Sequence, residues 1–169
     1  MSQVNSQAEP PRRRKIKWSA YAAAAWSFIF AALSFYWAMG GTAGAETLGV
    51  AFQDPEVVGD PSFVAVVWFS AFLKLLLGVF ALLLVRTWVG HPSRRLILAL
   101  AWGSGILLTL YGGALVIQHA LMALRILDIP DSIGSLWAVG WHLFLWDPFW
   151  MMGCMLFLIA AWSATRRAD

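Results

Sequence analysis

The sequence predicts an all-α, polytopic membrane protein, a bundle of four transmembrane helices. Composition is the first observation: of 169 residues, 60% are hydrophobic and 12% are charged, whereas soluble domains have about 45–50% apolar and about 25% charged residues. The second is a series of long runs that almost lack charge, and the third is the gathering of basic residues on one side of these runs. The composition excludes an ordinary soluble enzyme and a disordered chain, and the single cysteine excludes a scaffold of internal disulfides.

A span is expected wherever a run is long enough to cross the hydrocarbon core, which takes about 20 apolar residues in a helix. Four long runs of the sequence almost lack charged residues. The first and third runs contain none, the second contains only Lys74, and the fourth contains only Asp147. These runs predict spans at about 18–39, 62–85, 96–122 and 147–165.

The fourth run, 132–165, is too long for one simple crossing, and the pair Asp147–Pro148 predicts a break within it. Asp is a favoured N-cap and Pro a favoured first residue of a helix. Residues 132–146 would then form a separate segment at the level of the lipid headgroups, where tryptophans are enriched. The alternative is a kinked, continuous helix that buries Asp147 more deeply.

The basic residues predict the orientation, because Lys and Arg collect on the cytoplasmic side. All of them except Lys74 and Arg125 precede the first span, follow the last, or lie between the second and third. Both termini are therefore expected in the cytoplasm. The opposite side is expected to be acidic, and it contains Glu46, Asp54, Glu56, Asp60, Asp128 and Asp131.

The two tails follow from this orientation. Residues 1–17 are expected to form a disordered basic cytoplasmic tail, and residues 166–169 a short cytoplasmic tail. The basic tail is expected to bind anionic lipid headgroups rather than nucleic acid.

Ala43-Gly44-Ala45 after the first apolar stretch resembles a signal-peptide cleavage site. That stretch is longer than the 7–15 residues typical of signal peptides, which favours a retained span in a multi-pass protein of the cell membrane.

Small residues predict which faces of the helices pack together, because they let backbones in lipid approach closely. The first span contains a stripe spaced alternately by three and four residues, from Ala20 to Gly41. Ser70 and Lys74 of the second span share a face with a glycine, as His119 does in the third. The expected packing residues are Ala24, Ser27, Ala31, Ser34, Gly78 and Gly112.

Ionisable and polar residues within the spans predict an outward-facing polar pocket. A lysine near the centre of a span costs at least about 2.5–3.5 kcal/mol to insert, so it should face the bundle interior. Asp147 is the expected partner of Lys74, although it could also serve only as a helix cap. The other candidates lie in the outer half of the membrane: Tyr36, Gln118, His119 and His142.

Neither metal nor cofactor is expected. His119 and His142 invite a haem or zinc interpretation, but the sequence contains no ligand motif for either. Satisfied interfacial side chains are the simpler interpretation of each histidine. No nucleophile–base pair or phosphate-binding loop is found in the sequence.

Two short motifs resemble those of a known family. Residues 35–41, Phe-Tyr-Trp-Ala-Met-Gly-Gly, resemble the Tyr-Trp-Ala-Leu-Gly-Gly signature of small four-span bacterial proteins that share domain of unknown function 3995. Residues 145–150, Leu-Trp-Asp-Pro-Phe-Trp, resemble the signature of that family's last span. The resemblance covers about residues 18–165 and implies a bacterial cell membrane and four helices, but no activity. It gives particular weight to Tyr36, Trp37, Gly40, Gly41, Asp147 and Pro148.

Three classes of function remain open. The favoured one is a non-enzymatic structural or accessory protein in the lipid bilayer. The second is a small transporter or proton-linked permease that uses Lys74 and Asp147. The third is a membrane enzyme or redox carrier that acts on a lipid or quinone. The sequence leaves open whether the chain forms a homo-oligomer or binds another membrane protein.

Overall fold

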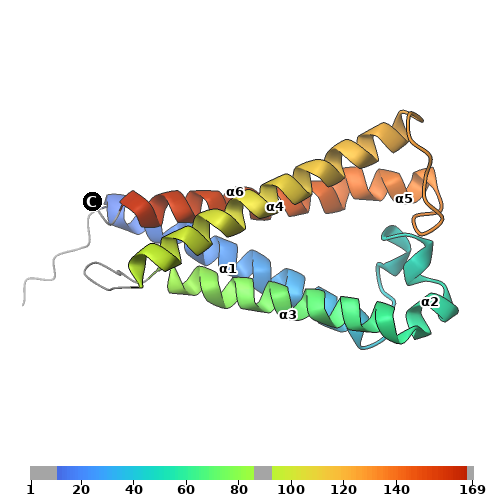
Figure 1. Cartoon of the computed structure of the whole chain (residues 1–169), viewed down its shortest axis with the longest axis horizontal. Helices are drawn as coiled ribbons and strands as arrows, with labels where there is room; N and C mark the ends of the chain where they lie inside the picture. Colours follow the sequence, from blue (N-terminus) through green and yellow to red (C-terminus); the bar gives the residue numbers. More distant parts are fainter. Residues whose placement is uncertain (1–10, 86–92, 167–169) are drawn as a thin grey trace, which may run out of the picture.

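The computed structural model of the chain describes residues 11–85 and 93–166, which form an all-α fold (Figure 1). Four segments are long and apolar enough to cross a membrane, as the sequence predicts: Trp18–Ala38, Pro61–Leu83, Arg94–Ala123 and Leu136–Arg166. In chain order the elements are α1 (Pro11–Ala38), the 3-10 turns η1 (Ala45–Thr47) and η2 (Val50–Phe52), α2 (Pro55–Gly59), α3 (Pro61–Leu83), α4 (Arg94–Ala123), α5 (Leu136–Trp141), the π-helical turn η3 (His142–Trp146) and α6 (Asp147–Arg166).

Helix α1 begins earlier than the expected first span. It starts at Pro11, so residues 11–17 are helical instead of part of a disordered tail. Proline suits the first position of a helix, and the Arg and Lys residues that follow have high helix propensity. The rest of the expected tails, residues 1–10 and 167–169, lies outside the described residues, as does the connection 86–92.

The predicted break before Asp147 is wrong. Residues Leu136–Arg166 form one helical path through α5, η3 and α6. In η3 the N–H of Asp147 donates to the carbonyl of His142, which is the wider hydrogen bond of a π-helix. This turn lies directly before Pro148, whose ring would clash with a carbonyl in a regular α-helix. A full break would leave backbone groups unpaired in hydrocarbon, so an unbroken helix is favoured.

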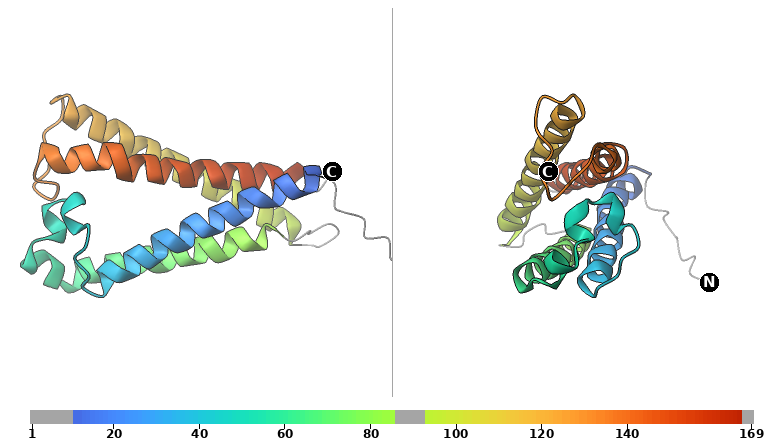
Figure 2. Two further views of the ribbon diagram at one scale, coloured as in Figure 1. Left: turned by 180° about the vertical axis from the view of Figure 1, so that it is seen from behind. Right: turned by 90° about the vertical axis from the view of Figure 1, so that its right-hand side faces the viewer.

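The long helices are arranged as two pairs. Helix α1 packs along α3, α4 packs along α6, and contacts between α1 and α6 join the pairs. The pairs lie close together where α3 ends and α4 begins, and they diverge toward the end that carries α2 and α5 (Figures 1 and 2).

Small side chains line the contacts between helices. Ala24, Ser27, Ala31 and Ser34 of α1 are each no more than 3% exposed. A side chain added at Gly78 of α3 would collide with Phe28 of α1, and one added at Gly112 of α4 would collide with Trp150 of α6. The absent side chains therefore let one large aromatic residue enter each of these two contacts.

Trp26 of α1 fixes the contact with α6. Its indole lies against Gly153, where no Cβ could fit. Its Nε1–H donates to the carbonyl oxygen of Phe149 at 2.8 Å. Its ring packs edge-on against Phe30, Trp150 and Phe157. The residue is 3% exposed, so this aromatic cluster forms the centre of the bundle.

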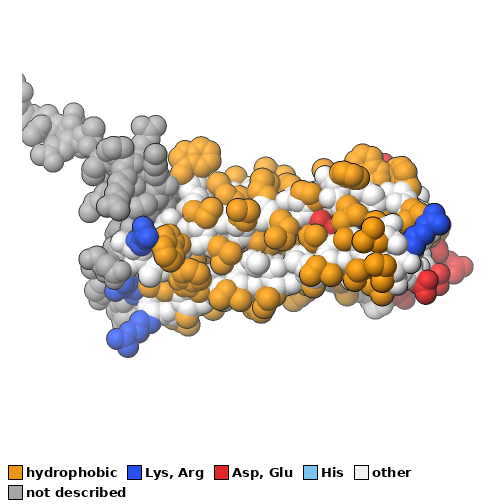
Figure 3. Space-filling model, turned by 90° about the horizontal axis from the view of Figure 1, so that it is seen from above, with side chains coloured by type: hydrophobic (Ala, Val, Ile, Leu, Met, Phe, Trp, Pro, Cys, Tyr) orange, Lys and Arg blue, Asp and Glu red, His pale blue; other side chains and the backbone are white. Residues whose placement is uncertain are grey.

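The surface has an apolar middle and two charged ends (Figure 3). Bulky residues of α3 and α4 face outward, among them Phe69 at 68% and Leu107 at 68% exposure. Most of the basic side chains in this view lie at the end where α4 begins, whereas the acidic residues lie at the end that carries α2 and α5, beside one basic patch. We call these the basic end and the acidic end. An apolar band between two charged rims matches a bilayer.

The connections at the acidic end are ordered by caps and by contact with one another. The carboxylate of Asp60 caps α3: it accepts from the N–H of Ser62 at 2.8 Å, from the N–H of Phe63 at 3.1 Å and from the Ser62 hydroxyl. These hydrogen bonds, led by the hydroxyl, hold the pKa of Asp60 below its ordinary value of 3.8. The N–H of Ala51 donates to the carbonyl of Ser132 at 3.0 Å, which joins the two connections.

Candidate functional site

A cavity of about 340 Å³ lies between the two helix pairs, in the half of the bundle nearer the acidic end. Its walls are mostly apolar and aromatic, with contributions from Trp37, Phe52, Phe63, Tyr111, Trp146 and Trp150. Its polar lining comes from Ser34, Ser70, Lys74, His142 and Asp147. The cavity therefore combines an apolar wall with a small number of polar groups, which is typical of ligand sites.

Lys74 of α3 places its ammonium group among neutral partners. The Nζ atom donates to the hydroxyl of Ser34 at 2.9 Å and to the hydroxyl of Ser70 at 2.6 Å. It also lies 4.3 Å from the ring centre of Phe30 and 6.0 Å from that of Trp150. The residue is only 8% exposed. Cation–π contacts and hydroxyl oxygens favour the charged form but add no negative charge.

Lys74 and Asp147 do not form the predicted pair. Among the described residues, no carboxylate forms an ion pair with the Lys74 ammonium. Both side chains nevertheless line the same cavity. Asp147 is the first residue of α6, and its carboxylate contacts His119 of α4.

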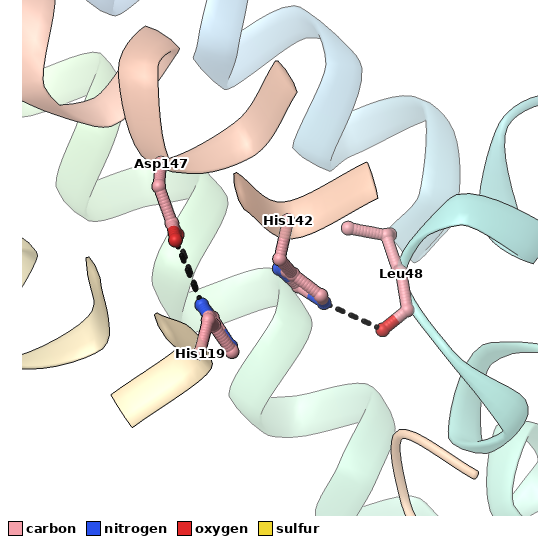
Figure 4. A network of polar contacts seen from close by, with 4 residues as sticks. All are labelled: Leu48, His119, His142 and Asp147. Atoms are coloured by element: carbon pink, nitrogen blue, oxygen red, sulfur yellow. Dashed lines mark hydrogen bonds and ion pairs between the residues drawn. The ribbon is translucent and has the colours of Figure 1, made fainter. Parts of the chain in front are cut away.

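Asp147 and His119 form a buried pair between α6 and α4 (Figure 4). The Nδ1 atom of His119 lies 2.9 Å and 3.1 Å from the two carboxylate oxygens. Each residue is 4% exposed. Nδ1 is thus the ring nitrogen that faces the carboxylate, which accepts hydrogen bonds when it is ionised.

His142 links the His119–Asp147 pair to the loops at the acidic end. Its ring stacks on that of His119, with the ring centres 4.4 Å apart and the planes inclined by 22°. Its Nε2 lies 3.1 Å from the carbonyl oxygen of Leu48 (Figure 4). A carbonyl has no proton to donate, so Nε2–H is the donor. Nearby, Trp146 donates to the hydroxyl of Thr47 at 3.1 Å.

The structure brings His119, His142 and Asp147 together into one group. One ligand atom from each residue lies within 4.8 Å of the other two. In residues 11–85 and 93–166 this is the one group of three or more such residues that could hold a metal ion. The sequence shows no ligand motif because His119 lies 28 positions from Asp147, on another helix.

Two candidate residues lie away from the cavity. Gln118 is exposed on α4, although its neighbour His119 is buried. Tyr36 is 40% exposed and lies outside the cavity lining. Its hydroxyl accepts from the N–H of Ala43 at 3.1 Å, so it shapes the turn after α1. Neighbouring positions on a helix point in different directions, which explains why Gln118 does not join His119.

Sequence reasoning missed part of the ammonium's surroundings. Ser34 was expected only as a packing residue, and Phe30 and Trp150 were not singled out. The four-residue spacing of Ser70 and Lys74 placed those two on one face of a helix, which was a usable signal. No local pattern links Phe30 to Lys74, because the two residues meet through the packing of α1 on α3.

Comparison with known proteins places the chain in one family. A family model described as "Protein of unknown function (DUF3995)" matches residues 27–157. The match begins within α1, ends within α6 and includes all of the polar residues described above. Neither the curated proteins nor the solved structures contain a match to the chain. Since the model covers most of the sequence, the resemblance seen in the two aromatic motifs is confirmed, and the chain belongs to the DUF3995 family.

Proposed function

We propose that this member of the family is a non-enzymatic accessory protein of the cell membrane whose outward-facing pocket binds an amphipathic molecule with an anionic head. The observation that carries the proposal is the ammonium of Lys74, which faces the cavity without an acidic partner among the described residues. Two hydroxyl groups orient it, and an anionic group of a ligand would supply the missing charge.

The energetics favour an anionic ligand. A lysine within the bilayer costs at least about 2.5–3.5 kcal/mol. The hydroxyls of Ser34 and Ser70 and the face of Phe30 offset part of that cost. A carboxylate or phosphate at Nζ would form a charge-assisted hydrogen bond, which is about twice as strong as a neutral one.

The position of the cavity favours a ligand with an apolar tail. Val66 of α3 and Tyr111 of α4 both line the cavity, and they are 66% and 56% exposed. Close contacts join α3 to α1 and α4 to α6, rather than α3 to α4. A tail could therefore leave the cavity between α3 and α4 and extend into the bilayer.

The proposed orientation has both termini in the cytoplasm and the cavity near the outer surface. It is supported by the separation of basic and acidic ends (Figure 3) and by the positive-inside rule. A cysteine introduced at Ser132, at the acidic end, should react with an impermeant maleimide in intact cells, whereas the buried Cys154 should not. Labelling of a cysteine at Ser93 instead, near the basic end, would contradict the orientation.

The two alternative functions use the same cavity differently. A proton-linked transporter would need Lys74 and Asp147 to act together, yet they bind different partners. An enzyme could use the contact between Ser70 and Lys74 as a nucleophile and base. Ser70 lies inside α3, where backbone N–H groups are engaged in the helix, so they offer no oxyanion hole.

Binding of simple amphiphiles tests the proposal. Purified protein in nanodiscs should bind decyl phosphate and decanoate, and it should bind neutral decanol much more weakly. Lys74→Met should weaken binding of the anions by about tenfold or more, the value of one charged hydrogen bond. Isothermal titration calorimetry measures these affinities.

A matched control uses Arg125, which like Lys74 is a basic residue away from the basic end. Arg125 is exposed beside the acidic end and does not line the cavity. Arg125→Met should therefore bind decyl phosphate as the wild type does. Equal affinities for decanol and decyl phosphate, or an unchanged Lys74→Met variant, would refute the anionic-head proposal. Flux of the amphiphile or a proton into sealed vesicles would favour the transporter instead.

A further inference from the structure

We infer that His119, His142 and Asp147 form a binding site for a divalent transition-metal ion, Zn²⁺ in the first instance. The site is distinct from the ammonium of Lys74 and does not depend on the proposed amphiphile. Its basis is the convergence of two imidazoles and a carboxylate from α4, η3 and α6 into one group, with ligand atoms within 4.8 Å of one another. Nothing in the family description assigns such a site.

His142 keeps one nitrogen free for a metal, and His119 offers the nitrogen that faces Asp147. Nδ1 of His119 lies 2.9 Å from the Asp147 carboxylate, so an ion that binds both residues takes the place of the proton between them. Nε2 of His142 donates to the Leu48 carbonyl, which leaves the lone pair of Nδ1. A histidine whose other nitrogen is held by a carboxylate or a carbonyl is the usual arrangement of metal-binding histidines. His142 has that arrangement here.

The donor set selects the class of ion. Imidazole nitrogens favour Zn²⁺, Cu²⁺, Fe²⁺ and Ni²⁺ over Mg²⁺ and Ca²⁺, which favour all-oxygen sites. Two histidines and one carboxylate leave at least one coordination position open in a tetrahedral zinc site. His142 and Asp147 both line the cavity, so that open position would be reached from it.

The contact between His119 and Asp147 does not by itself account for the cluster. The contact of His119 with Asp147 explains why those two residues are buried. It does not explain a second imidazole stacked on the first at 4.4 Å. The π-helical turn places His142 and Asp147 next to the same neighbour on α4, and π-helical turns occur frequently at functional sites.

Metal binding should change one hydrogen bond. A metal ion lies close to the plane of an imidazole that binds it, and the two rings are nearly parallel, inclined by 22°. One ion can therefore bind both rings only after His119 turns, which breaks its hydrogen bond to Asp147.

Titration of the full-length, metal-stripped protein in detergent tests the site. Calorimetry with Zn²⁺ should show one ion per chain, and Co²⁺ should produce visible d–d absorption. His119→Gln and His142→Gln should each weaken Zn²⁺ binding by about tenfold or more, the lower limit for losing even an outer-shell partner. Lys74→Met should leave Zn²⁺ affinity unchanged, which separates this test from that of the amphiphile.

The remaining histidine of the chain provides a matched control. The sequence contains three histidines, and the third is His91. His91→Gln removes the same chemical group and should leave Zn²⁺ affinity unchanged. His142→Gln leaves the Asp147–His119 pair in place, so it should fold even if His119→Gln does not. Absence of Zn²⁺ binding to the wild type, or binding that is unaffected by His142→Gln, would overturn the inference.

Discussion

Replacing Trp26 with alanine is expected to lower the free energy of unfolding by about 3–5 kcal/mol, the range for large aromatic residues in packed interiors. Lipid tails are as apolar as the interior, so this loss arises from contacts rather than from the hydrophobic effect. The indole fills the space over Gly153 and packs edge-on against Phe30, Trp150 and Phe157. Its removal would leave a cavity where α1 meets α6, together with an unused hydrogen-bond acceptor on Phe149.

Unfolding by SDS in mixed micelles, followed by near-ultraviolet circular dichroism, measures this effect. Trp18→Ala is the matched control, because Trp18 lies on the same helix and is 69% exposed. Its free energy of unfolding should stay within about 0.5 kcal/mol of the wild-type value, as is usual for surface changes. If the two alanine variants were equally stable, α1 would not be held to α6 by the indole of Trp26.

Replacing His119 with leucine in the metal-free protein is expected to cost about 3–5 kcal/mol, the range for leaving a buried charge without its partner. The substitution leaves the Asp147 carboxylate, 4% exposed, without its partner. Replacing both residues with leucine removes the buried charge as well. The double variant should therefore be more stable than His119→Leu alone.

The relative stabilities of these variants test whether His119 and Asp147 are electrostatically coupled. SDS unfolding of the wild type, both single variants and the double variant gives the coupling free energy. Gln118→Leu serves as the control, because Gln118 is the exposed neighbour of His119. Should the double variant lose as much stability as the two single variants together, the pair would contribute packing and no electrostatic coupling.

The spans could be predicted because crossing a bilayer depends on local properties. Hydrocarbon requires a run of about 20 apolar residues and penalises each charge within it. The second span was expected at 62–85 and runs over Pro61–Leu83. The third was expected at 96–122 and runs over Arg94–Ala123. Neither prediction needed knowledge of a neighbouring helix.

The fourth span shows where local signals mislead. Asp147–Pro148 is a strong start signal for a helix in water, where exposed backbone groups bind solvent. Within the bundle the backbone must satisfy its own hydrogen bonds. The chain therefore accommodates Pro148 with one π-helical turn, and Asp147 becomes a buried partner of His119 instead of a cap.

The polar residues, like the spans, show some features that the sequence predicts and others that it does not. The sequence was sufficient to place Lys74 in the membrane and to suggest that it faces inward, because charge in hydrocarbon is costly wherever it occurs. It could not assign the partners of Lys74 and Asp147. Those partners depend on the rotation and relative depth of packed helices, which bring the Lys74 ammonium to Ser34 and Ser70. Amino-acid composition and charge order were thus enough for the membrane topology that we propose, whereas the cavity and the cluster of His119, His142 and Asp147 exist only because long-range helix packing brings separate side chains within a few ångströms.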